Sequence, residues 1–163
     1  MIALLMTLAL QDVSEHVKPL EWMVGTWEGE GSLDEMPFKA TVKCEWAMNK
    51  NFIRSSFSAK AGDQIMWEDT GMFGWDRDKK KLVMFSFGMD GTIGTGDEVA
   101  STEKDTWILD TKLNSEDPRF KEGRAIIKRI DADTYSDTAQ MKKDGAYVTF
   151  LTCTYKRVKV SEK

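Results

Sequence analysis

The sequence has few of the residues that most often carry chemistry or cross-links: its 163 residues include one histidine, two cysteines and three prolines. Two cysteines are too few for a disulfide scaffold or a cysteine-based metal site. Beyond His16 the sequence has no histidine that could serve as the base of a serine or cysteine triad, and no Gly-x-Ser-x-Gly motif is present. We therefore predict no catalytic residue and no metal site.

Long apolar runs are also missing, since no segment reaches the roughly 20 residues that a membrane helix needs. The apolar stretch at residues 1–10 has the character of a secretory signal, although no lysine or arginine precedes it. Residues 1–11 are therefore either a signal peptide or an apolar N-terminal segment, and secreted, periplasmic and cytoplasmic locations stay open. Residues 12–163 are expected to form a single domain.

Charge of one sign is not concentrated anywhere. The formal net charge is −4, with acidic and basic residues interleaved, and 41% of residues are hydrophobic, as in an ordinary globular protein. Nucleic-acid binding requires clustered lysine and arginine, so nucleic acid is not expected as a partner. The oligomeric state is not determined by the sequence.

Alternation of apolar and polar residues dominates the chain from residue 24 onward. The clearest case is segment 37–48, whose inward face would carry Phe38, Ala40, Val42, Cys44, Trp46 and Met48. Further strands are expected near 52–60, 64–75, 80–88, 92–100, 104–113, 121–130, 134–142 and 146–158. In the last of them a shared face would carry Tyr147, Thr149, Leu151, Cys153 and Tyr155. A short helix is expected within 14–23, limited by Pro19.

Many consecutive strands joined by short turns predict an all-β, antiparallel up-and-down (meander) barrel of about ten strands, because closure removes exposed edges. Ten strands enclose more space than eight, so a cavity is expected. Its ligand-binding wall is predicted to contain Trp46, Met48, Ile53, Phe57, Trp67, Trp107, Leu109 and Leu151. Arg54 or Tyr155 would be polar anchors.

In two regions the alternation of apolar and polar residues does not determine which side chains point into the barrel. A two-residue turn before the strand at 52–60 would place Ile53, Ser55 and Phe57 inside, whereas a three-residue turn would place Phe52, Arg54 and Ser56 there. The first is favoured, because an inward arginine needs a partner. The facing of Phe73, Phe85 and Phe87 is not fixed by the pattern.

One face of residues 25–31 is Gly25, Trp27, Gly29 and Gly31, which suits an opening barrel strand bent at glycines and plugged by one large ring. This run, following Leu20-Glu21-Trp22-Met23, resembles the opening motif of nitrobindin-like haem-binding barrels, and residues 154–158 are similar to their ending. Residues 74–80 and 85–92 resemble a bacterial lipocalin-like family of unknown function. The resemblance covers about residues 20–158.

The resemblance implies a calycin (lipocalin-like) barrel in which Trp27 closes one end and Arg157 or Lys156 packs over its ring as a cation–π contact. In the nitrobindin-like group an axial histidine lies on the final strand, where this chain has none. Cys153, Tyr155 and Tyr147 would be the remaining haem ligands. No cofactor is therefore expected, and a haem or nitric-oxide-type barrel without the usual histidine is kept as an alternative.

The expected function is a non-enzymatic protein that binds a small, mostly apolar molecule inside the barrel. One alternative is a structural or protein-interaction barrel, which would have a filled interior and an exposed apolar patch outside. The other is a calycin-type enzyme, in which Arg54, Asp69, Asp97 or Tyr135 would converge. Cys44 and Cys153 are expected to be small buried residues, and a disulfide between them would need Cα atoms within about 7 Å.

Overall fold

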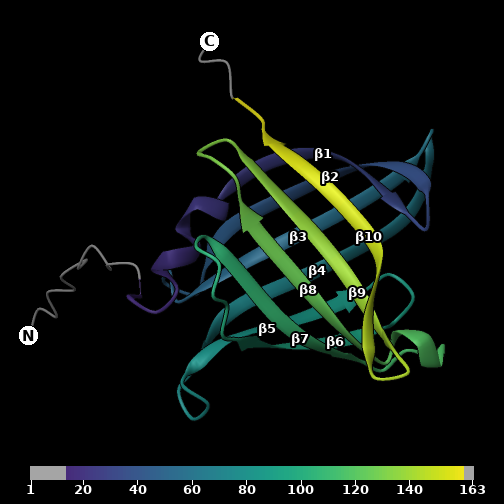
Figure 1. The fold of residues 1–163 in the computed structure, drawn as a ribbon. Coiled ribbons are helices and arrows are strands. Elements are labelled where there is room, and N and C mark those ends of the chain that lie inside the picture. Colours follow the sequence, from purple (N-terminus) through teal and green to yellow (C-terminus); the bar gives the residue numbers. More distant parts are fainter. Residues whose placement is uncertain (1–13, 160–163) are drawn as a thin grey trace, which may run out of the picture.

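A computed structural model describes residues 14–159 of the chain, and in them ten antiparallel strands close into a barrel (Figure 1). The strands are β1 (Gly25–Leu33), β2 (Met36–Ala47), β3 (Phe52–Ala61), β4 (Gln64–Asp76), β5 (Lys81–Gly88), β6 (Ile93–Val99), β7 (Thr106–Leu113), β8 (Glu122–Arg129), β9 (Thr134–Lys143) and β10 (Ala146–Arg157). Each strand pairs with its neighbours in the chain, and β1 pairs with β10 to close the ring. The predicted all-β meander barrel, consistent with a calycin-like architecture, is confirmed.

Two short 3-10 helices lie at opposite ends of the barrel (Figure 1). The first, η1 (Lys18–Met23), has its proline in the first turn, where a missing N–H costs no internal hydrogen bond, and it is the short helix that was predicted. The second, η2 (Pro118–Phe120), lies in the connection between β7 and β8. We call the two ends of the barrel the η1 end and the η2 end. No helix within residues 14–159 has both the length and the apolar character of a membrane span.

The interior is packed at one end and accessible at the other. At the η1 end, Trp27, Ile53 and Tyr155 are almost completely buried. Toward the η2 end, inward-facing side chains keep partial exposure: Phe57, Trp67, Asp69, Met84, Ala125, Ala139 and Leu151. Because the wall of the barrel is closed, a partly accessible inward side chain must border space that water can enter. The side chains with the lowest exposure therefore gather toward the η1 end, and partly exposed inward side chains are more frequent toward the η2 end.

The two cysteines are free and buried. Cys44 pairs with Gly25 of β1 and Cys153 pairs with Gly31, six residues further along the same strand. At the usual rise of a strand this separation is roughly 20 Å, which is far beyond disulfide reach. The apolar segment 1–11 lies outside the described residues.

Candidate functional site

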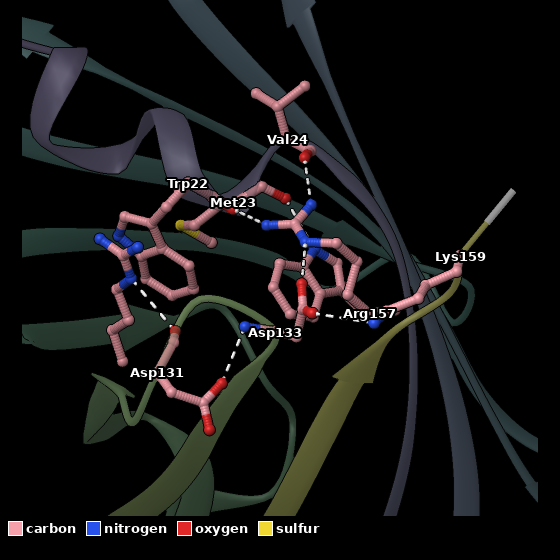
Figure 2. A network of polar contacts seen from close by, with 9 residues as sticks. Trp22, Met23, Val24, Asp131, Asp133, Arg157 and Lys159 are labelled. Carbon is pink, nitrogen blue, oxygen red and sulfur yellow. Dashed lines mark hydrogen bonds and ion pairs between the residues drawn. The ribbon is translucent and has the colours of Figure 1, made fainter.

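The η1 end is closed by Trp27 and Arg157. Figure 2 shows the polar contacts of Arg157 with Val24 and Asp133 at this end. The Trp27 indole donates a hydrogen bond from Nε1 to the Met23 carbonyl at 2.8 Å. The Arg157 guanidinium lies 4.1 Å from the centre of the Trp27 ring. It also donates to the carbonyls of Val24 at 2.8 Å and Trp22 at 2.7 Å. The predicted contact between Arg157 and Trp27 is thus present, whereas Lys156 is exposed.

An aromatic cluster fills the space next to this closure. Tyr135 and Tyr155 stack with their ring centres 4.5 Å apart, and Tyr135 meets Trp27 edge-on at 4.9 Å. Trp107 lies 5.6 Å from Trp22 between ring centres. Burial raises the pKa of both tyrosines well above the ordinary range, so both phenols stay neutral. The cluster therefore belongs to the solid core of the barrel.

Several predicted wall residues lie in this packed half. Ile53, Leu109 and Tyr155 are buried there, and Trp46 and Trp107 pack against the same core. Their inward facing agrees with the alternation, but their surroundings are filled with side chains. Phe57, Trp67 and Leu151 are the predicted wall residues that face the accessible half. Their contact with a ligand stays a prediction.

Two predicted wall residues are placed wrongly. Met48 follows the end of β2 in a left-handed conformation, with φ at 45°, and is 66% exposed, because the strand stops at Ala47. Arg54 points outward, where its Nη2 lies 2.7 Å from Glu45 Oε2. It cannot be an interior anchor.

The favoured facing of β3 is nevertheless correct, since Ile53, Ser55 and Phe57 face inward. The connection before it has four residues, 48–51, and an even number preserves the parity of the expected two-residue turn. Phe73 faces inward and is buried, while Phe85 and Phe87 face outward.

The prediction of one shared inward face along β10 is wrong for the residues at the start of the strand. The register of β10 with β9 shifts between Thr149 and Leu151. A β-bulge adds one residue and reverses the facing of those that precede it. Tyr147 therefore lies on the outer wall, where its hydroxyl donates to Asp110 at 3.2 Å and the Arg124 guanidinium lies 4.0 Å from its ring centre.

The interior contains a carboxyl group that sequence reasoning missed. Asp137 of β9 faces inward between Ile127 of β8 and Cys153 of β10. Its Oδ1 atom is inaccessible and has no hydrogen-bond partner. Burial raises the pKa of Asp137 to about 7, and the charge of Asp69 contributes to the rise. The alternation of Tyr135, Asp137 and Ala139 was the signal that could have found it.

Asp69 of β4 faces Asp137 from the opposite wall. In the ring of ten strands, β4 and β9 are five strands apart in either direction. Trp67 Nε1 donates a hydrogen bond of 3.0 Å to Asp69 Oδ2. Burial raises the pKa of Asp69, and the hydrogen bond from Trp67 partly offsets this rise. The interior therefore holds the carboxyl groups of Asp69 and Asp137 among aromatic and apolar side chains.

The residues named for an enzymatic site do not converge. Arg54 and Asp97 lie on the outer wall, and Asp97 Oδ1 is 2.7 Å from Lys79 Nζ. Asp69 and Tyr135 lie inside, in different halves. Adjacent residues of a strand point to opposite faces, so Glu98 faces inward, where it accepts a hydrogen bond from the Leu82 amide at 3.0 Å.

The candidate metal and haem ligands can be located in the described part of the chain. Within residues 14–159 no group of three or more His, Cys, Asp or Glu side chains is placed to hold a metal ion. Burial raises the pKa of Cys153 to about 11, so its thiol is neutral. Of the three candidate haem ligands, Cys153 and Tyr155 lie inside the barrel and Tyr147 outside.

The outer wall carries a shallow groove of about 520 Å³ across β2 to β5, whose lining includes Lys43, Glu68, Phe87 and Met89. Next to it, exposed apolar side chains lie on β5, β6 and the turn between them: Phe85, Phe87, Met89 and Ile93. Such a patch is the feature expected of an interaction surface.

A family model described as "Protein of unknown function (DUF1579)" matches residues 12–157. None of the curated proteins compared with the chain matches it. Among solved structures, Rv2717c from M. tuberculosis is 16% identical with a TM-score of 0.73, and the similarity covers 91% of this chain and 100% of that one.

Two further structures are more distant. The S-type phycobiliprotein lyase CPES from Guillardia theta is 10% identical with a TM-score of 0.51, covering 88% of this chain and 93% of that one. A de novo designed fluorescence-activating β-barrel is 14% identical with a TM-score of 0.44, covering 85% and 95%. At these identities the likeness shows the fold alone, and the nitrobindin-like relation stays an expectation.

Proposed function

Because the chain belongs to the DUF1579 family, whose description gives no function, we propose from the barrel itself that the protein binds a small molecule inside the η2 half. The observation that carries the proposal is the unequal filling of the interior. Trp27 and Arg157 close the η1 end, whereas side chains such as Trp67 and Met84 border accessible space. A ligand would therefore enter from the η2 end.

The lining supports a ligand with a substantial apolar body. Phe57, Trp67, Met84 and Leu151 offer apolar surface in the accessible half. Burial of apolar surface contributes about 25 cal/mol per Å² to binding before the costs of association are subtracted. The carboxyl groups of Asp69 and Asp137 modify the original expectation of a mostly apolar molecule, because they give the site a polar end.

The proposal includes no bond-making step and no cofactor. It is supported by the separation of Arg54 and Asp97 from Asp69 and Tyr135 across the barrel wall. A haem-type barrel would need an axial ligand other than histidine on β10. The neutral thiol of Cys153 is a poor choice for that role.

Binding of an uncharged, environment-sensitive dye such as Nile red tests the proposal. We expect blue-shifted fluorescence that saturates at one dye per chain. Ala125→Phe should weaken binding about tenfold or more, because Ala125 faces the accessible interior and the larger ring would occupy it. Ile126→Phe, one residue along β8 and on the outer face, is the matched control and should leave binding unchanged.

The exposed patch around Phe85 and Phe87 supports a second candidate, an interaction barrel whose partner is a second copy of this chain. The adjoining groove carries Lys43 and Glu68, so a twofold arrangement can match opposite charges around an apolar centre. A chain that takes up no dye and sediments as a dimer would favour this candidate. Equal dye binding by Ala125→Phe and the wild type would also contradict the interior site.

A further inference from the structure

We propose that the interior site selects a cation, specifically a protonated amine on an apolar body, and holds the ammonium group between Asp137 and Asp69. The inference rests on the proposed function, because it names the class of molecule that the same interior site would take.

The two carboxyl groups have no cation of the protein's own between them. The arginines that face inward, Arg129 and Arg157, lie at the η1 end. Arg129 donates to the Asp131 carbonyl at 3.2 Å, and Arg157 is held by Asp133 and by the carbonyls of η1. Among the described residues, neither Asp69 nor Asp137 forms an ion pair. The third inward-facing carboxyl, that of Glu98, accepts a hydrogen bond from the Leu82 amide. Two like charges thus face one interior space without compensation.

A ligand ammonium group would supply the hydrogen-bond donor and the positive charge that the site lacks. A carboxylate oxygen that is buried without a partner is costly, since it has lost water and gained no hydrogen bond. Asp137 Oδ1 is such an atom. An ammonium group brings three N–H donors and a positive charge, so it can donate to Asp137 and is also attracted by the carboxyl group of Asp69. An anion of the same shape would meet like charge.

The surroundings favour an organic cation over a metal ion. The described residues hold no group of three metal-ligating side chains. Phe57 pairs with Asp69 across β3 and β4, and Trp67 lies two residues away on the same face. These rings offer a surface for an apolar body and for cation–π contact beside the carboxyl.

The charge of the site depends on Asp137 and on few other groups. The titratable side chains that face it are Asp69 from β4, Cys153 and Tyr155 from β10, and Tyr135 from its own strand. Burial keeps the thiol and both phenols neutral near pH 7. Ionisation of Asp137 near pH 7 therefore makes the site more negative, and the affinity for a protonated amine should rise as the pH increases from 5 to 8.

Three probes with one ring system test the inference by titration calorimetry: 1-naphthylmethylamine, 1-naphthylmethanol and 1-naphthoate. At pH 8 the amine should bind about tenfold or more tightly than the alcohol, and the naphthoate most weakly. At pH 5 the advantage of the amine should shrink several-fold. Asp137→Asn should remove most of that advantage at pH 8 while leaving the affinity for the alcohol within about twofold.

The control is Glu68→Gln, which removes a carboxylate from the same strand as Asp69 but from its outer face, and should change no affinity. Asp69→Asn is the second variant should Asp137→Asn fail to fold, and it should also reduce the preference for the amine. Equal affinities for amine and alcohol in the wild type would overturn the inference while the interior site stands. A lack of binding by all three probes would overturn both.

Discussion

At the scale of single residues, two enclosed side chains of the interior differ in whether their polar atoms have hydrogen-bond partners. Trp27 is completely buried, and its one polar atom is satisfied by the Met23 carbonyl. Asp137 is also enclosed, but one of its oxygen atoms has no partner. The first arrangement stabilises the fold, and the second lowers its stability whenever the carboxyl is ionised.

Replacement of the Asp137 carboxyl should change how stability depends on pH. The pKa rises from about 3.8 in the unfolded chain to about 7 in the fold. A raised carboxyl pKa means that stability is fully present below pH 4 and is lost as the pH increases to about 7. Asp137→Asn removes this loss. Relative to the wild type, the variant should gain stability between pH 4 and pH 8, with an upper limit of about 4 kcal/mol.

Denaturant unfolding of both proteins at pH 4, 6 and 8 measures this difference, and comparison across pH cancels any constant cost of the asparagine. If the difference in free energy of unfolding between the variant and the wild type does not change with pH, Asp137 is ionised throughout that range in the folded protein.

Removal of the Trp27 ring should destabilise the barrel strongly. Trp27→Ala deletes a completely buried indole together with its contacts to Arg157 and Tyr135, a loss of about 3–5 kcal/mol. For a domain of this size the melting temperature should fall by about 10 °C or more. Trp67→Ala, in the accessible half, is the matched control and should cost clearly less. Similar melting temperatures for the two variants would contradict the division into packed and accessible halves.

At the scale of the elements, β1 depends on close approach to its neighbour β10. A Cβ atom at Gly31 would meet the Thr152 carbonyl oxygen and would lie 2.9 Å from the Cys153 Cα atom. Both are backbone atoms of the strand that closes the barrel, so they cannot move aside without disturbing the ladder between β1 and β10.

Gly31→Ala should therefore lower the free energy of unfolding by about 2 kcal/mol or more, as overpacking against backbone does. Ser32→Ala, the adjacent residue on β1, provides the control and should have a small effect. Thermal melts followed by circular dichroism measure both. A melting temperature unchanged in Gly31→Ala would mean that the seam between β1 and β10 is looser than the register indicates.

The strands also show where alternation predicts facing and where it fails. Alternation placed Phe38, Ala40 and Val42 inside correctly, because β2 runs without interruption up to Ala47. It failed for Tyr147, because the bulge near Phe150 reverses the face within a continuous run of strand residues. Nothing in the local composition marks that bulge.

At the scale of the whole molecule, closure of the sheet brings β4 and β9 to opposite walls and leaves one half of the interior accessible. Asp69 and Asp137 are 68 positions apart in the chain, so no motif or spacing connects them. By alternation Asp137 shares a face with Tyr135 and Ala139, but no local feature shows that its carboxyl group is enclosed. From the sequence, Phe57 and Trp67 were predicted as wall residues and Asp69 was named only for an enzymatic site, whereas Asp137 was not predicted.

The contact of Arg157 or Lys156 with Trp27 was implied by the resemblance to known barrels. By itself, the sequence determined the approximate number of strands, their antiparallel order and the facing of most side chains. These features follow from local alternation, turn residues and short connections, which act between chain neighbours. Only the tertiary structure decided which inward residues are packed and which border open space, and which carboxyl groups face each other. Those outcomes depend on distances across the closed barrel, and such distances arise only when the first and last strands pair.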